Sequence, residues 1–254
     1  MRGVLRLSAD LAASATFARW GRRKVLPVLL VLLALLSGWY QWRRENPPLP
    51  STIEGYALVG PRGPACLRIV IGLDVSGSMD QYAHPRDEAL KSLLRWAKEG
   101  YSLRDADRVA VVDFALGASV RLPPQPVKSD VPALAAPAVD TGDTRVEQLL
   151  DRVAGFPDDG CETALLLLSD GIVTDLPPTH VEGNAMLAAH GIRSVHLLVP
   201  GVDVSVPDEW TRAFPIAPPI TFDGADSGAT SLVIGSVVAA LTGQRFVPLN
   251  TPTP

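Results

Sequence analysis

The chain has 254 residues, of which 47% are hydrophobic and 20% are charged, as in an ordinary folded globular protein. The overall net charge of −4 is unevenly distributed, because residues 1–46 carry a net charge of +6 and residues 47–254 a net charge of −10. Since nucleic-acid binding requires a basic face, the acidic composition of the larger part argues against a nucleic-acid partner.

An uncharged apolar segment follows the basic N-terminus. Residues 25–42 carry no charged side chain. As a helix they would span about 27 Å, which is close to the roughly 30 Å of a bilayer's hydrocarbon core. Trp39, Tyr40 and Trp42 lie at the C-terminal end of the segment, where aromatic side chains favour the membrane interface. We therefore expect one transmembrane helix, an uncleaved signal anchor, at residues 25–42.

The distribution of basic residues predicts the orientation of this helix. Four basic residues closely precede it and two follow it: Arg19, Arg22, Arg23 and Lys24, then Arg43 and Arg44. The positive-inside rule predicts a cytoplasmic segment at residues 1–24, and a single-pass protein of the inner (cytoplasmic) membrane whose acidic domain is periplasmic or extracellular. Two alternatives are a cleaved signal peptide, for which Ser37–Tyr40 is a poor cleavage site, and a buried helix of a soluble protein.

The rest of the chain divides into a linker, one domain and a tail. Residues 43–64 are rich in Pro and Gly and show no sustained hydrophobic period, which predicts an extended linker. Strand and helix signals then alternate over residues 65–245. This alternation predicts an α/β domain with a doubly wound, mostly parallel sheet and helices on both faces. Residues 246–254 are predicted to be a C-terminal tail.

The elements of this domain follow from hydrophobic periodicity. Six strands are expected, at Leu67–Leu73, Arg108–Ala115, Ala118–Leu122, Thr163–Ser169, Ser194–Val199 and Ile220–Phe222. Five helices are expected, at His84–Gly100, Thr144–Gly155, Thr179–His190, Asp208–Phe214 and Ser227–Leu241. Pro123–Ala138 is expected to be an irregular loop, and Ala118–Leu122 to pair with the preceding strand as a hairpin.

Three loops with oxygen-bearing side chains adjoin apolar elements. DVSGS (Asp74–Ser78) follows the first strand, DTGDT (Asp140–Thr144) precedes a helix, and SDG (Ser169–Gly171) follows another buried strand. Ligands of doubly wound sheets bind beyond the carboxyl ends of the strands. Carboxylate and hydroxyl oxygens are the ligands that a small divalent cation such as Mg²⁺ prefers. The pattern therefore predicts a cation site at this edge of the sheet.

These motifs resemble those of von Willebrand factor type A (vWA) domains. DVSGS matches the Asp-x-Ser-x-Ser motif of vWA domains and integrin inserted domains, and Gly142–Thr144 resembles the family's metal-binding threonine loop. LLLLSDG (Leu165–Gly171) resembles its strand-ending aspartate, and the similarity covers about residues 66–245. The resemblance implies a Rossmann-like vWA fold with a metal-ion-dependent adhesion site.

The resemblance also implies the ligands of that site, which would hold Mg²⁺, or alternatively Mn²⁺ or Ca²⁺. Ser76, Ser78 and Thr144 would coordinate the cation by their hydroxyls, and Asp74 and Asp170 directly or through water. In the family, an acidic side chain of a protein partner fills the remaining position.

Several alternatives stay open at this point. Thr144 is favoured over Thr141 by its position at the start of a helix, and Asp143 is a candidate N-cap of the same helix. Asp74 and the two serines also fit a simple helix-capping turn, or a vWA fold without a metal. Asp113 is expected to close its strand locally.

The two cysteines, Cys66 and Cys161, each lie just before a buried strand. In the family's topology those strands are parallel neighbours, and adjacent strands are about 4.8 Å apart. The predicted compartment is oxidising. The resemblance therefore implies a Cys66–Cys161 disulfide, opposite the metal edge of the sheet. The alternative is a pair of free buried thiols.

The function implied by the resemblance is binding of a protein partner through the cation by a membrane-anchored, extracytoplasmic vWA domain. One alternative is a scaffold of envelope assembly with a purely structural metal site. A metal-dependent hydrolase is less well supported, because Asp74–Ser76 lacks the second aspartate of an Asp-x-Asp phosphatase and neither Ser76 nor Ser78 lies in G-x-S-x-G. We therefore expect no enzyme activity and no small-molecule substrate.

Overall fold

The computed structural model describes residues 30–43, 48–63, 65–130, 134 and 139–249. The chain forms two compact units, Met1–Leu49 and Pro50–Pro254. In the first unit, residues 30–43 are helical. None of the helices in the described ranges is long and apolar enough to cross a membrane. The predicted span at residues 25–42 begins outside these ranges, as does the predicted cytoplasmic segment at residues 1–24, and both remain predictions.

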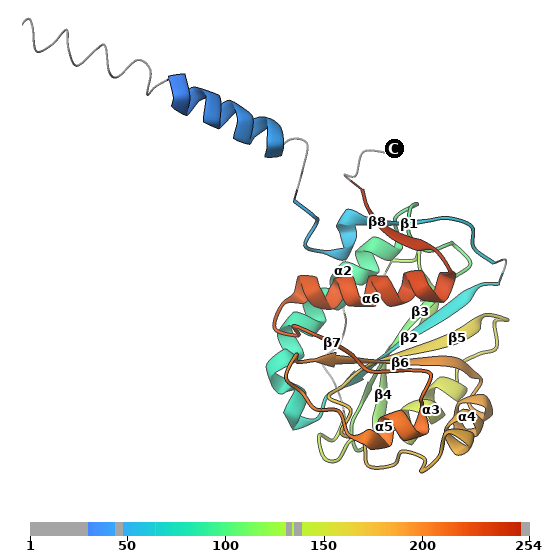
Figure 1. Ribbon diagram of the computed structural model, residues 1–254. Helices are drawn as coiled ribbons and strands as arrows, with labels where there is room; N and C mark the ends of the chain where they lie inside the picture. The colour runs from blue at the N-terminus through green and yellow to red at the C-terminus, as the bar shows by residue number, and fades with distance from the viewer. Residues whose placement is uncertain (1–29, 44–47, 64, 131–133, 135–138, 250–254) are drawn as a thin grey trace, which may run out of the picture. The chain divides into compact units, whose positions relative to one another are not determined.

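A six-stranded sheet forms the centre of the second unit, with the strand order β4-β3-β2-β5-β6-β7 (Figure 1). Its strands are β2 (Leu67–Asp74), β3 (Arg108–Phe114), β4 (Ala118–Pro126), β5 (Glu162–Leu168), β6 (Ile192–Pro200) and β7 (Ile220–Phe222). Neighbouring strands pair in parallel except β3 and β4, which are antiparallel. This arrangement confirms the mostly parallel sheet and the predicted hairpin. β4 continues to Pro126, however, into the segment expected to be an irregular loop.

Helices cover both faces of this sheet (Figure 1). Its helices are α2 (Ala83–Ala97), α3 (Val146–Ala154), α4 (His180–Ala189), α5 (Asp208–Ala213) and α6 (Ser227–Thr242). Ile69 and Ile71 of β2 belong to the core cluster shared with α2 and α6, whereas Val70 belongs to the cluster shared with α3, α4 and α5. Successive side chains of a strand point to opposite faces, so β2 is buried along its whole length. The near-continuous apolar run of its sequence has this physical cause.

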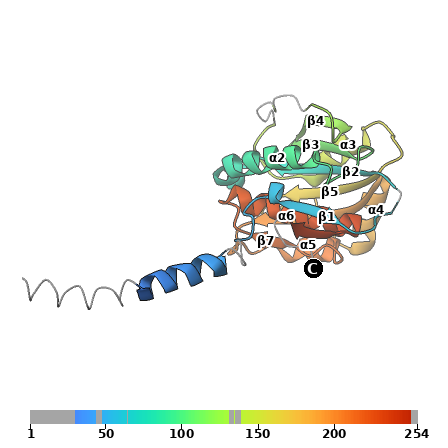
Figure 2. The same ribbon diagram turned by 90° about the horizontal axis from the view of Figure 1, so that it is seen from above.

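The segment expected to be a linker is partly folded into the domain. Residues Ile53–Gly55 form a short 3₁₀ helix, η1, and β1 (Tyr56–Val59) pairs antiparallel with β8 (Arg245–Pro248). These elements lie beside α6 (Figure 1 and Figure 2). The boundaries predicted at residues 43–64 and 246–254 therefore differ from the structure. Two four-residue strands far apart in the chain carry too weak a local signal to be recognised from hydrophobic periodicity.

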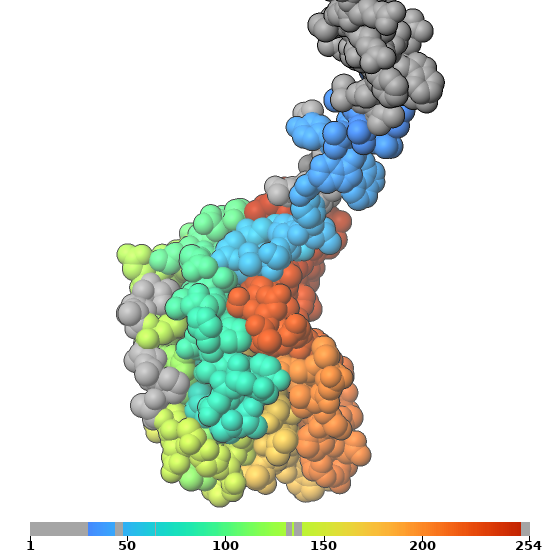
Figure 3. All heavy atoms as spheres, turned by 90° about the vertical axis from the view of Figure 1, so that its left-hand side faces the viewer, coloured from blue at the N-terminus to red at the C-terminus, as the bar shows by residue number. Residues whose placement is uncertain are grey.

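Specific contacts hold η1, β1 and β8 against the helices α2 and α6. Ile53 is fully buried, and its backbone N–H donates to the hydroxyl of Ser231 on α6 at 3.1 Å. The rings of Tyr56 and Phe246 stack with their centroids 4.4 Å apart, and the indole N–H of Trp96 on α2 donates to the Tyr56 carbonyl. Figure 3 shows this segment, α2 and α6 side by side on one surface of the unit. The domain therefore begins near Pro50 rather than at residue 65.

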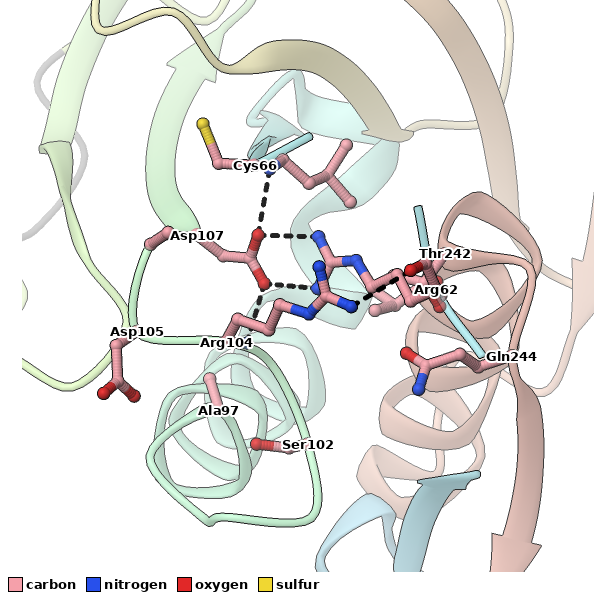
Figure 4. Close-up of polar contacts among 12 residues, drawn as sticks. Arg62, Cys66, Ala97, Ser102, Arg104, Asp105, Asp107, Thr242 and Gln244 are labelled. Carbon is pink, nitrogen blue, oxygen red and sulfur yellow. Dashed lines mark hydrogen bonds and ion pairs between the residues drawn. The ribbon is translucent and has the colours of Figure 1, made fainter. Parts of the chain in front are cut away.

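A disulfide and a buried ion pair stabilise the amino end of the sheet. Cys66 and Cys161 are disulfide-bonded with their Cα atoms 4.7 Å apart, which confirms the predicted pairing. Nearby, Asp107 is fully buried and accepts two hydrogen bonds from Arg62, both at 2.6 Å (Figure 4). The same carboxylate accepts the backbone N–H of Leu67, at the start of β2, and that of Arg104.

Candidate metal centre

The predicted site lies at the carboxyl edge of the sheet, where β2 ends at Asp74. From β2 the chain passes to β3 on one side, and it later returns to place β5 on the other side. The ends of β2 and β5 therefore form a topological switch point, the position at which open α/β sheets bind ligands. Asp74 ends β2, and Ser169 and Asp170 directly follow β5.

The Asp74 carboxylate is the centre of this cluster. The residue has no exposed surface, and its Oδ2 accepts a 2.6 Å hydrogen bond from the hydroxyl of Ser169. Its Oδ1 accepts the backbone N–H of Ser76 at 2.9 Å and lies 3.5 Å from the Thr144 hydroxyl. Burial raises the pKa of Asp74 and the nearby charge of Asp170 adds to that rise, whereas the hydrogen bonds from Ser169 and Ser76 oppose it.

The two serines of the motif lie together on the outer side of Asp74. Their hydroxyl oxygens are 3.2 Å apart. Ser76 is buried, whereas Gly77 and Ser78 are exposed at the start of η2 (Gly77–Tyr82). The cluster is therefore closed towards the sheet and open to solvent at Ser78.

The structure distinguishes Thr144 from Thr141. Thr144 is buried with its hydroxyl directed at Asp74, and its carbonyl accepts the backbone N–H of Thr174 at 3.0 Å. Thr141 is exposed. The five predicted ligands thus lie at or beyond the ends of β2 and β5 and in the loop before α3, and the Thr144 hydroxyl lies beside the Asp74 carboxylate. Their role in coordination remains a prediction.

The structure excludes Asp143, which the sequence left open as a candidate N-cap of the following helix. α3 begins at Val146, and the Asp143 side chain does not cap it. Instead, the carboxylate of Asp175 accepts the backbone N–H groups of Val146 and Glu147 at 2.8 and 2.9 Å. Sequence patterns miss this cap because Asp175 is 29 residues away, whereas the known capping motifs are local.

The donor set fits a small oxygen-preferring dication. Two carboxylates, Asp74 and Asp170, are both nearly buried and close enough for the charge of one to raise the pKa of the other. A dication would relieve this repulsion, and three hydroxyls would supply further hard oxygen ligands. In the described part of the chain, no group of three or more His, Cys, Asp and Glu side chains is placed so that it could hold a metal ion. The site would therefore depend on hydroxyls and water for most of its coordination.

No protein-family model matches this chain, and no curated protein matches it. Solved structures do resemble this one. Proximal thread matrix protein 1 from the mussel byssus, with a zinc-occupied MIDAS motif, has 17% identity and a TM-score of 0.50, over 76% of this chain and 49% of that chain. This chain thus spans about half the length of the mussel protein.

Two bacterial structures are similar at slightly lower scores. A von Willebrand factor type A structure from Catenulispora acidiphila has 20% identity and a TM-score of 0.49, over 70% of this chain and 43% of that chain. An aerotolerance-related membrane protein from Bacteroides fragilis has 19% identity and a TM-score of 0.44, over 68% of this chain and 99% of that chain. At these identities the likeness concerns the fold alone.

Proposed function

The second unit has the fold of a von Willebrand factor type A domain, and we propose that it binds a protein partner through a divalent cation. The cation would be held by Asp74, Ser76, Ser78, Thr144 and Asp170, with Mg²⁺ as the first candidate and Mn²⁺ or Ca²⁺ as alternatives. One observation carries this proposal: at the switch point of the sheet, a buried carboxylate meets the backbone N–H of Ser76 and the hydroxyls of Thr144 and Ser169, which come from three separate loops.

The residues around Asp74 would have different roles in such a site. Ser169 holds one oxygen of the Asp74 carboxylate and the Ser76 N–H holds the other, so the carboxylate has a fixed orientation. The exposed Ser78 marks the side from which a partner approaches. When bound, the cation offers a coordination position to an acidic side chain of the partner. An acidic residue is the expected contact because carboxylate oxygens are hard ligands that small dications prefer.

We infer binding rather than catalysis. The side chains that contact the Asp74 carboxylate are the hydroxyls of Ser169 and Thr144, which do not titrate near neutral pH. Such groups do not provide the general acid or base of a hydrolase.

We also propose that the domain is anchored in the inner membrane by residues 25–42 and lies outside the cytoplasm. Two observations support this location. The apolar segment is preceded by a denser basic cluster than the one that follows it, which favours a cytoplasmic N-terminus. The Cys66–Cys161 disulfide also suits an oxidising compartment. Treating intact cells with a membrane-impermeant amine label would test this topology. We expect the lysines of the second unit to be labelled in intact cells, and labelling of these lysines only after lysis would contradict the topology.

Metal binding is tested on the purified full chain by calorimetric titration with Mg²⁺ and Mn²⁺. We expect one equivalent to bind the wild-type protein and none to bind Asp74→Asn, which keeps the size of the side chain but removes its charge. Asp105→Asn is the matched control, because Asp105 is an exposed aspartate in the loop before β3, at the opposite edge of the sheet. A wild-type protein that binds neither ion would contradict the proposal.

The partner is sought by affinity capture with and without EDTA, followed by mass spectrometry. We expect a protein that is captured by the wild type with Mg²⁺ and is lost both with EDTA and with Asp74→Asn. Capture that survives both changes would contradict recognition through the cation. If Mg²⁺ raises the melting temperature while capture is unaffected, the scaffold with a structural metal is favoured instead.

A further inference from the structure

A network of charged side chains lies beside the end of β2. Arg86 of α2, Asp113 of β3 and Arg121 of β4 are all buried, with exposed fractions of 4% for Arg86 and 1% for Asp113, and 1% for the Arg121 side chain. Asp87, the next residue on α2, completes the network at the surface. The two arginines and two aspartates balance in formal charge.

Arg121 forms ion pairs with both aspartates. Its Nε donates to Asp113 Oδ2 at 2.8 Å and its Nη2 lies 2.6 Å from Asp113 Oδ1. Its Nη1 donates to Asp87 Oδ1 at 3.0 Å. This paired geometry joins the end of β3 to β4 and to α2. Asp113, expected to close its strand locally, is therefore part of an ion pair between strands.

Arg86 is different, because its closest partner is not a carboxylate. Its Nη1 donates to the backbone carbonyl of Asp74 at 2.8 Å, whereas its nearest carboxylate contact, to Asp87, is 3.5 Å long. Burying a guanidinium costs desolvation free energy unless paired charges and hydrogen bonds offset that cost. Here the buried charge is directed at the one peptide that carries the central carboxylate of the candidate metal centre.

Among the hydrogen bonds that hold the turn after Asp74, three act on the two peptides that follow the Asp74 Cα atom. The Val75 N–H donates to the Phe114 carbonyl on β3 at 2.9 Å, and the Ser76 N–H donates to the Asp74 carboxylate at 2.9 Å. The third is the bond from Arg86 to the Asp74 carbonyl. Because the carbonyl and the carboxylate both belong to Asp74 and Ser76 lies only two residues further on, a rotation of the Asp74 peptide would displace both predicted ligands.

We propose that Arg86 is a positioning residue of the metal centre, which holds the Asp74 peptide in the orientation needed for cation binding. The inference rests on the proposed function, since it concerns the same site. Arg121 and Asp113 keep α2 in place against the strands, so that the guanidinium of Arg86 is itself held in position. The network thus links the position of the Arg86 guanidinium to the orientation of the Asp74 peptide.

The test measures Mg²⁺ affinity and stability separately on the full chain. We expect Arg86→Gln to weaken Mg²⁺ binding by about tenfold, the loss typical of a charge-assisted hydrogen bond. Leu90→Ala is the stability control, because Leu90 is a buried core residue of α2 that does not take part in the network. Leu90→Ala should lower the stability measured by urea unfolding in EDTA while leaving the Mg²⁺ affinity unchanged.

A second pair of variants separates an effect on Mg²⁺ binding from a failure of Arg86→Gln to fold. Arg86→Lys keeps the charge but replaces the planar guanidinium by a single ammonium, and we expect it to fold and to bind Mg²⁺ at least threefold more weakly. Arg95→Gln, an exposed arginine of the same helix, should bind Mg²⁺ like the wild type. Wild-type affinity in the folded Arg86 variants would overturn the inference. Absence of Mg²⁺ binding by the wild type would instead overturn the proposed function.

Discussion

The hydroxyl of Ser169 donates a 2.6 Å hydrogen bond to the Asp74 carboxylate, and both residues are fully buried. The bond joins the ends of β2 and β5, which are parallel neighbours. The orientation of the carboxylate is therefore set by the strand beside it as well as by its own turn. This relationship gives Ser169 a role in the metal centre although it is not among the predicted ligands.

Replacing Ser169 by alanine should weaken Mg²⁺ binding by about tenfold, because hydrogen bonds to charged groups contribute about 1.5–3 kcal/mol. Calorimetric titration of the folded variant measures the change. Ser236→Ala is the matched control, since Ser236 lies on the exposed side of α6 and bonds only its own helix. Equal affinities of Ser169→Ala and wild type would show that this bond does not position the carboxylate.

Removal of the disulfide should destabilise the domain without affecting the metal centre. The bridge joins residues separated by 95 positions, and closing so long a loop stabilises the native state by about 2–5 kcal/mol. We expect the double variant Cys66→Ser/Cys161→Ser to lose about this amount in urea unfolding. Its Mg²⁺ affinity should not change, because Cys66 precedes β2 and Asp74 ends it. In the wild type, labelling of two thiols without a reductant would contradict the disulfide.

The ion pair between Arg62 and Asp107 should be a major determinant of stability. Asp107 is fully buried and accepts hydrogen bonds from Arg62 and from two backbone N–H groups. Asp107→Asn leaves the buried guanidinium without its counter-charge, and we expect it to lower the free energy of unfolding by about 3–5 kcal/mol.

The control for this ion pair is Arg193→Ala. Arg193 pairs with Glu162 at the surface, where the two side chains are 71% and 42% exposed. Exposed pairs contribute about 0–1 kcal/mol, so this variant should unfold almost like the wild type. Similar losses in the two variants would contradict the importance assigned to burial.

His196 should make the stability of the domain depend on pH. Burial lowers the pKa of His196 below its ordinary value of 6.5, and its Nε2 is buried with no hydrogen-bond partner among the described residues. Below pH 6.5 the unfolded chain therefore binds a proton more readily than the folded chain. The free energy of unfolding should fall as the pH decreases through this range.

Urea unfolding at pH 7.5 and 5.5 tests this expectation (the two values bracket the ordinary pKa by about one unit). His196→Gln should lose less stability between the two values than the wild type does. His180→Gln, an exposed position on α4, is the control. An identical pH dependence of wild type and His196→Gln would show that His196 does not contribute.

Much of the domain was predictable because its signals are local. The strand at Leu67 was recognisable from its continuous apolar run, since a strand buried on both faces needs apolar side chains at every position. The threonine at position 144 was recognisable from its place before a helix, and the structure puts it at the Asp74 carboxylate. The disulfide followed from the family's strand order together with the positions of the two cysteines.

Other features depend on contacts between distant residues. The pairing of β1 with β8, the capping of α3 by Asp175, and the bond from Arg86 to the Asp74 carbonyl each join segments that no local pattern connects. Each involves a short strand or a single side chain, which carries no periodicity of its own.

By itself, the sequence determined the α/β class, the order of strands and helices, and the motif at Asp74–Ser78, because periodicity and turn residues act over a few positions. Only the tertiary structure decided what else surrounds that motif: Ser169 at the carboxylate and Arg86 at the carbonyl. Hydrogen bonds act over about 3 Å in space, irrespective of separation along the chain. Ser169 and Arg86 therefore became identifiable as partners of Asp74 only once the strands and helices were packed together.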